Sequence, residues 1–233
     1  MTRAAPSTNN TARESAGIPV LRLEGGIGGG QPVNLRYVSG FLARADITHG
    51  LRVVIDSPGG NRDEAISIYN TIRALPVPTW AHVERECCSG ATLIYMAASY
   101  RTAAPGAEFL FHATRIEKTS LPDGHLTARD LRRYAEGLEK QDADMVTVLA
   151  RRTGSSPAWF ADQLETEYPV SAAELLNPGI VHEIVGLTFP AGGAFLRELP
   201  KLKARGHVAD YYSTANFRAA CEAADHFPEG RGG

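Results

Sequence analysis

The chain is poor in cysteine and has almost no net charge. Its three cysteines, Cys87, Cys88 and Cys221, are an odd number with two members adjacent, which disfavours a disulfide-stapled secreted fold. No cysteine or histidine pair has zinc-ligand spacing, so we expect no metal site and no cofactor. The 24 Lys and Arg against 26 Asp and Glu give a net charge of −2 without a basic block. A nucleic-acid partner is therefore not expected.

Long apolar runs are also missing. The opening segment 1–17 lacks the apolar stretch of a signal peptide, and no later window approaches the length of a transmembrane helix. We therefore expect no membrane partner and, given the cysteine usage, a reducing compartment, most simply the cytoplasm.

The composition of the chain and its apolar pattern predict a single α/β core. The chain has 233 residues, of which 43% are hydrophobic, enough for a single core with an appendage. Apolar periodicities alternate between strand and helix, which favours a mainly parallel sheet with crossover helices. We predict strands at 18–24, 51–56, 78–84 and 107–112, helices at 32–46, 61–75, 89–99, 127–154 and 156–166, and a loop, short helix and final strand within 167–186.

The stretch ECCSGATLIYMAAS raises the question of what Ser89 does. Ser89 stands directly before an apolar helix, where a serine hydroxyl commonly caps the first backbone N–H groups. The same position suits a nucleophile, because the helix field and its unpaired N–H groups favour an oxyanion. Adjacent Cys88 could be proposed as a thiol nucleophile, although buried cysteines usually act as small hydrophobic residues. Which role holds depends on a base, a third residue and oxyanion donors.

The stretch DSPGG ends a strand whose continuous apolar run predicts burial on both faces. Pro58 and Gly59 have the chemistry of a type II turn, so a plain turn is one interpretation. Two consecutive glycines also allow backbone N–H groups to approach a ligand closely, as an oxyanion hole requires. Taken alone, this segment is ambiguous.

The order of these segments resembles the proteolytic subunit of the Clp protease. The matching motifs are Ser57-Pro58-Gly59-Gly60, Ser89-Gly90-Ala91 and Phe109-Leu110-Phe111-His112, followed by the late stretch RRTGSSPAWFADQLETEYPVSAAELLNPGIVHEIV. The resemblance runs from about residue 18 to 187. It implies an α/β fold of the ClpP/crotonase type, with repeated ββα units, a mainly parallel sheet and a projecting handle helix.

Composition and the extent of the resemblance together predict a domain division. Residues 1–17 are small and polar and are expected to form a disordered N-terminal segment. Residues 18–187 carry the resemblance and would form a Clp-protease-like catalytic domain, and 188–233 would be an additional, partly helical C-terminal extension.

Carried over residue by residue, the family's motifs assign a catalytic set. Ser89 matches the nucleophile, His112 the general base, and Glu167 the acid that stands four positions before the family's Ser-Ala pair, here Ser171-Ala172. Glu165 lies two residues away and is the alternative acid. The backbone N–H groups of Gly60 and Gly90 match the oxyanion donors, and Pro58 and Gly59 are expected to contact substrate. A serine needs a base, a tautomer-fixing acid and oxyanion donors in this way whatever the family.

The implied function is a serine endopeptidase that hydrolyses peptide bonds in a peptide or unfolded protein. Two alternatives stay open: a crotonase-type acyl-CoA enzyme, which uses a similar oxyanion hole, and a non-catalytic peptide-binding or assembly module. Chains of this kind are also expected to form homo-oligomers, here through an apolar stripe at Leu131, Leu138, Met145 and Leu149. The resemblance further implies that an ATPase unfoldase is a partner.

Overall fold

The computed structural model describes residues 17–116, 120–122, 124–176 and 178–185. The proposed C-terminal extension at 188–233 lies outside the described residues, as does the N-terminal segment up to residue 16.

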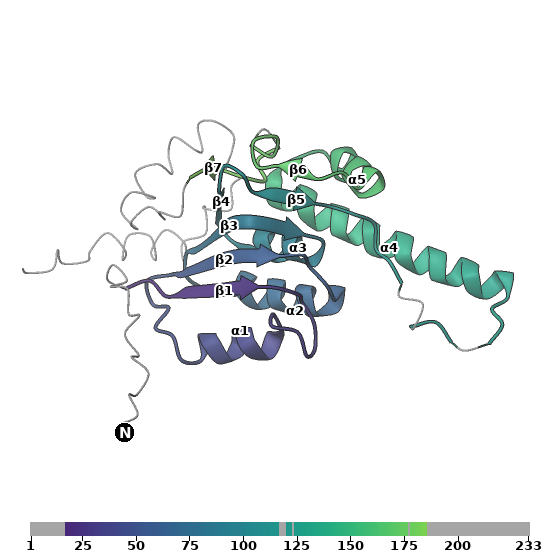
Figure 1. Ribbon diagram of the computed structural model, residues 1–233, viewed down its shortest axis with the longest axis horizontal. Helices are drawn as coiled ribbons and strands as arrows, with labels where there is room; N and C mark the ends of the chain where they lie inside the picture. Colours follow the sequence, from purple (N-terminus) through teal and green to yellow (C-terminus); the bar gives the residue numbers. More distant parts are fainter. Residues whose placement is uncertain (1–16, 117–119, 123, 177, 186–233) are drawn as a thin grey trace, which may run out of the picture.

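A mainly parallel sheet forms the centre of the fold (Figure 1). Its main path runs in the order β1-β2-β3-β4-β7, and all of these neighbours pair in parallel. The strand β3 is long enough to pair with two strands in succession: its first half pairs with β4 and its last residues with β5. The strands are β1 (Val20–Glu24), β2 (Leu51–Ser57), β3 (Thr79–Cys88), β4 (Tyr100–Ala103), β5 (Glu108–Leu110), β6 (Val170–Ser171) and β7 (Glu183–Ile184).

The helices begin and end at recognisable capping residues. Asn61 caps the next helix by accepting the N–H of Glu64, Thr127 forms a reciprocal capping box with Asp130, and Gly154 closes a helix in the left-handed conformation. The helices are α1 (Leu35–Leu42), α2 (Arg62–Arg73), α3 (Gly90–Ala97), α4 (Ala128–Thr153) and α5 (Pro157–Thr166).

Helix α3 is the most deeply buried helix of the described residues. Seven of its eight residues are buried, and it packs against α2, α4 and β3. Its aromatic Tyr95 lies edge-on to Phe109 of β5, with ring centroids 5.4 Å apart. Because α3 is buried along almost its whole length, the residue that precedes it is held firmly between the sheet and the helices.

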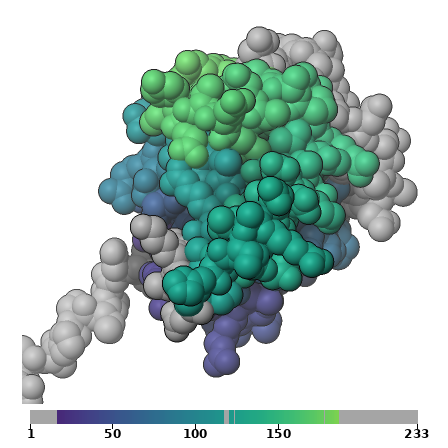
Figure 2. All heavy atoms as spheres, turned by 90° about the vertical axis from the view of Figure 1, so that its right-hand side faces the viewer, coloured from purple at the N-terminus to yellow at the C-terminus, as the bar shows by residue number. Residues whose placement is uncertain are grey.

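Helix α4 extends beyond the sheet as the predicted handle (Figure 1). Figure 2 looks at this end of the molecule and shows α4 in teal at its centre, with α5 in green above and α1 in purple below. The apolar stripe predicted along α4 is only partly available for a partner. Leu149 is buried in the chain's own core and Met145 packs against that core, whereas Leu131 is 54% exposed.

The α/β class, the mainly parallel sheet and the handle are confirmed, but four local predictions are wrong. The strand predicted to end at His112 ends at Leu110, and Tyr100–Ala103 form an additional buried strand rather than a turn. Residues 172–176 form turns instead of a short helix. Strand β3 also runs to Cys88, four residues beyond its predicted end, because β5 supplies a second partner for it.

Candidate active site

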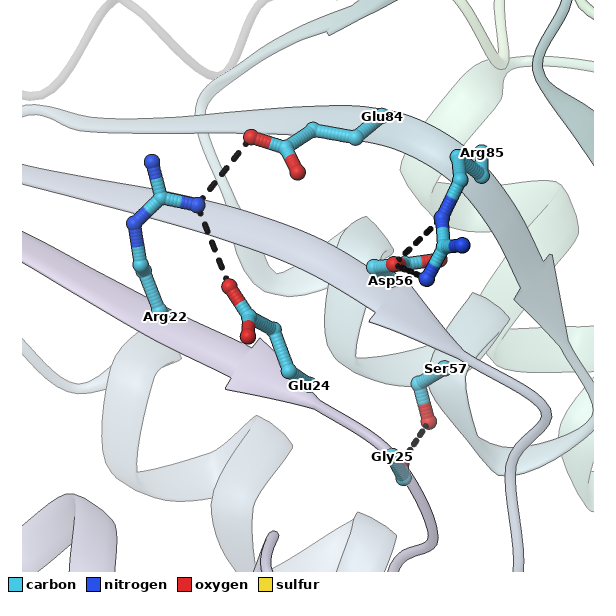
Figure 3. A network of polar contacts seen from close by, with 7 residues as sticks. All are labelled: Arg22, Glu24, Gly25, Asp56, Ser57, Glu84 and Arg85. Atoms are coloured by element: carbon cyan, nitrogen blue, oxygen red, sulfur yellow. Dashed lines mark hydrogen bonds and ion pairs between the residues drawn. The ribbon is translucent and has the colours of Figure 1, made fainter.

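The turn after β2 is held by one buried serine hydroxyl. Ser57 Oγ accepts the N–H of Gly59 at 3.1 Å. It also donates to the carbonyl of Gly25 at 2.7 Å (Figure 3). Ser57 is 1% exposed, so water competes little for its hydroxyl. The Pro-Gly-Gly turn is thereby tied to the glycine-rich loop that follows β1.

That glycine-rich loop forms a short ladder with the turn. The N–H of Ile27 donates to the carbonyl of Gly59, and the carbonyl of Ile27 accepts the N–H of Asn61, both at 2.8 Å. This ladder does not use the N–H of Gly60. Gly60 itself has φ 146°, and a β-carbon there would lie 2.2 Å from the Ile27 carbonyl oxygen, so only glycine fits.

An ion pair lies beside the base of the turn. Arg85 Nε donates to Asp56 at 2.8 Å, and the same carboxylate oxygen also accepts from Arg85 Nη2 (Figure 3). The register between β2 and β3 slips after Ile55, so β3 has extra residues here and one of them is Arg85. Such an irregularity redirects a side chain across the sheet.

Ser89 occupies a strained elbow between β3 and α3. Its φ of 54° and ψ of −127° are rare for a residue with a side chain, and its hydroxyl makes no capping bond to the helix. Its own N–H donates to the carbonyl of Leu110 at 2.8 Å, which fixes the elbow to β5. Strain of about 1–3 kcal/mol of this kind persists where the surroundings impose it, and it concentrates at functional sites. The capping interpretation of Ser89 is therefore wrong for its side chain.

Gly90 begins α3 and lies close to the glycine turn. A β-carbon on Gly90 would lie 2.9 Å from the Ala65 β-carbon and 3.7 Å from the Gly60 carbonyl oxygen. Because Gly90 has no side chain, the first turn of α3 packs directly against α2. Because the first N–H groups of a helix have no partner within it, the N–H of Gly90 is available to a ligand near Ser89.

His112 lies two residues beyond β5 and is half-buried. Its Nδ1 is 2.8 Å from the carbonyl oxygen of Ala113. A carbonyl only accepts, so Nδ1 carries the proton of the neutral imidazole and Nε2 is left as an acceptor. That is the tautomer a general base needs.

Ser89 and His112 line one cleft of about 920 Å³ together with Pro58, Gly60 and Gly90. We call it the serine cleft. Its apolar walls come from four helices, and the sequence did not indicate that α4 contributes one of them. The apolar wall residues include Ile66 and Tyr69 of α2, Leu93 of α3, Leu138, Met145 and Val148 of α4, and Leu164 of α5.

Glu167 lies at the C-terminal cap of α5 in the left-handed conformation, with φ 53°. Its carboxylate forms an ion pair with Arg115, another residue that lines the serine cleft. Among the described residues, no hydrogen bond or ion pair joins Glu167 to His112. Glu165 is exposed on α5. Arg115 was not predicted to belong to the site, and its place three residues after His112 is the signal in the sequence that points to it.

The cysteine beside Ser89 is poorly suited to act as a nucleophile. Burial raises the pKa of the Cys88 thiol to about 11, with the nearby Glu86 carboxylate adding to the effect. The pKa of Cys87 is raised well above its ordinary value because the residue is completely buried. A thiolate at either position is scarce at neutral pH, which leaves Ser89 as the better candidate.

His82 does not belong to the site. It is 1% exposed, its Nδ1 lies 2.8 Å from the Thr102 hydroxyl, and burial lowers its pKa.

In the part of the chain that the structure describes, no group of three or more His, Cys, Asp or Glu side chains is placed to hold a metal ion. No helix within the described ranges combines the length and apolarity needed to cross a bilayer.

Comparison with known proteins decides the family. A sequence model of the Clp protease matches residues 40–187. This chain belongs to the Clp protease family. It is 28% identical over 149 residues to an ATP-dependent Clp protease proteolytic subunit 1 of Shouchella clausii, covering 62% of this chain and 73% of that protein. It is 27% identical over 139 residues to a proteolytic subunit 2 of Treponema denticola, covering 59% and 66%.

The fold agrees with this assignment. A solved structure of a ClpP1 mutant from Listeria monocytogenes superposes with a TM-score of 0.57 at 18% sequence identity. The alignment covers 71% of this chain and 90% of that one. The Clp-type α/β fold predicted from the motifs is thus confirmed.

Proposed function

We propose that this Clp family member is a serine peptidase, with Ser89 as nucleophile and His112 as general base. The observation that carries the proposal is the strained Ser89 elbow, whose hydroxyl caps nothing and opens into the same cleft as His112. The strained backbone of Ser89 gains no capping bond that would stabilise the helix. The same conformation does expose the hydroxyl, as a nucleophile requires.

The chemistry proceeds by acyl transfer to water. His112 Nε2 takes the Ser89 hydroxyl proton as the serine oxygen bonds to the peptide carbonyl carbon, and the N–H groups of Gly60 and Gly90 stabilise the resulting oxyanion. The carbon–nitrogen bond then breaks, and His112 gives its proton to the leaving amine. Water then attacks the acyl-enzyme ester carbonyl while His112 takes one of its protons, and the ester bond breaks to release the carboxylic acid product. His112 returns that proton to the Ser89 oxygen.

The remaining assignments belong to the same proposal. Pro58 and Gly59 contact the bound peptide, as expected for residues that flank the oxyanion turn. Glu167 is the acid that orients His112 during turnover, after leaving its ion pair with Arg115. A carboxylate in that position stabilises the imidazolium that forms in each half of the reaction.

The assembly proposed for the chain is a homo-oligomer, with an ATPase unfoldase as a further partner. The similarity to proteolytic subunits of ATP-dependent Clp proteases supports this. The free thiols of Cys87 and Cys88 are compatible with a reducing compartment, and we propose the cytoplasm.

A fluorophosphonate probe tests the nucleophile directly. Wild-type protein is expected to be labelled at Ser89, and Ser89→Ala to be unlabelled although folded by circular dichroism. Ser120→Ala is the matched control, because Ser120 lines the same cleft. Cys88→Ala should also keep its labelling. Equal labelling of wild type and Ser89→Ala would reject Ser89 as nucleophile.

A further inference from the structure

Arg115 is a cation inside the serine cleft. It lies three residues after His112 on the segment that follows β5, and it lines the cleft together with Ser89 and His112. Its side chain is 63% exposed, so a ligand in the cleft can reach the guanidinium. An arginine in that position presents a planar donor fork that suits a carboxylate.

The present partner of Arg115 is the residue proposed to orient His112. The Arg115 guanidinium bonds to Glu167 Oε2, and the Glu167 side chain is 38% exposed. Ion pairs this exposed contribute little to stability, since water competes for both charges. A second carboxylate can therefore replace Glu167 on Arg115 at low cost.

Among the described residues, the hydrogen-bond partner of His112 is a neutral group. Its Nδ1 bonds to the Ala113 carbonyl, which stabilises an imidazolium less well than a carboxylate does. The N–H of Ala113 in turn donates to the carbonyl of Leu164 at 3.0 Å, and Leu164 lies on α5 three residues before Glu167. The segment that holds His112 and the end of α5 that holds Glu167 are thus directly joined.

We propose that Arg115 selects peptides that carry a carboxylate close to the scissile bond, because binding that carboxylate releases Glu167 to orient His112. The inference rests on the proposed peptidase function. The substrate's own anionic group, from a Glu or Asp side chain, completes the catalytic set. A peptide without such a group leaves Glu167 on Arg115 and is cleaved slowly.

The other charges of the cleft do not have this connection. Arg62 also lines the cleft, but its ion-pair partner is the neighbouring Asp63, at 3.5 Å. Asp144 pairs with Lys140 within α4, also at 3.5 Å. Arg62→Gln is therefore a matched control: it removes a cleft cation without freeing Glu167.

The experiment compares fluorogenic peptides that differ only by Glu or Gln, placed in turn at each position flanking the scissile bond. For wild type, kcat is expected to be about tenfold higher or more for the best Glu peptide than for its Gln partner. Arg62→Gln should keep this ratio. Arg115→Gln should bring the ratio close to one by raising kcat on the Gln peptide, since Glu167 is then always free. Arg115→Gln/Glu167→Gln should be slow on both.

Several outcomes overturn the inference. One is a wild-type ratio near one at every position, and another is an Arg115→Gln variant that loses activity equally on both peptides while remaining folded. Ser89 labelling by the fluorophosphonate separates these from failure of the proposed function. Labelling with no Glu preference rejects the role of Arg115 alone, whereas absence of labelling rejects both.

Discussion

The β-carbon of Ser89 lies 2.6 Å from the point that a β-carbon on Gly59 would occupy. The turn after β2 and the elbow before α3 are therefore in direct contact through a glycine that leaves no room for a side chain. Because the two segments come from adjacent parallel strands, their ends meet at one edge of the sheet. This contact holds the turn that contains Gly60 against the elbow that contains Ser89.

Gly59→Ala is expected to destabilise the protein and to abolish Ser89 labelling. The new methyl group would lie 2.4 Å from the Cys88 carbonyl oxygen, and the residue has φ 90°. We expect a loss of about 2–4 kcal/mol in the free energy of unfolding, measured by urea denaturation. Gly29→Ala is the control, because nothing lies within 4 Å of a β-carbon there. Wild-type labelling in Gly59→Ala would contradict the packing of the turn on the elbow.

Ser57→Ala should lower kcat more than it changes KM. The substitution removes the hydroxyl that accepts from Gly59 and donates to Gly25, so the turn loses its tie to the loop after β1. The cost is about 1–3 kcal/mol in unfolding free energy, since two buried polar groups lose a partner. Ser67→Ala removes a comparable hydroxyl bond on the exposed side of α2 and serves as the control. An unchanged kcat in Ser57→Ala would show that the turn holds its shape without this hydroxyl.

Arg101→Met is expected to unfold the protein or to lower its melting temperature strongly. Arg101 is 2% exposed and donates to the carbonyls of Ala98, Gly179 and Ile180 at 2.8–3.1 Å. Methionine fills the space but removes the donor from the Gly179 and Ile180 carbonyls, at a cost of about 3 kcal/mol. The Ala98 carbonyl still accepts from Arg152 at 2.8 Å. Thermal unfolding followed by circular dichroism measures the effect. Arg132→Met, on the exposed face of α4, should behave like wild type.

Cys88 should resist alkylation in the folded protein at pH 8. With a thiol pKa of about 11, only about one molecule in a thousand carries the thiolate at that pH. Iodoacetamide modification, mapped by peptide mass spectrometry, should accelerate as the pH rises towards 11 and should be fast in urea. Folding favours the protonated thiol, so stability is fully present below pH 9 and falls as the pH rises through about 11. Rapid native-state alkylation at pH 8 would revive Cys88 as a nucleophile.

Leu131→Glu should weaken self-association. Leu131 is 54% exposed near the start of the projecting helix α4, and burying it between copies would stabilise an oligomer. Light scattering should report a mass well above the 25.0 kDa of one chain for wild type, and a smaller one for the variant. Thr147→Glu, exposed at the other end of α4, is the control. A wild-type mass of one chain at all concentrations would reject the oligomer.

The sequence by itself predicted the elements whose signals are local. Helices α2, α4 and α5 begin within one or two residues of their predicted starts, because Asn61, Thr127 and Ser156 cap them through their own side chains. The buried strand β2 and the two glycine motifs were also evident from apolar runs and turn residues. Family motifs identified Ser89 and His112, and the structure places both in one cleft.

Tertiary structure alone decided how these elements meet. The strand β4 has only four residues, all buried, and such a short run carries no periodicity that distinguishes it from a turn. The extra length of β3 depends on pairing with β5, which is distant along the chain. Likewise, whether the Glu167 carboxylate binds His112 or Arg115 depends on which of these side chains the folded chain brings within reach. A carboxylate binds whichever charge is nearest, and that distance is a property of packing rather than of sequence.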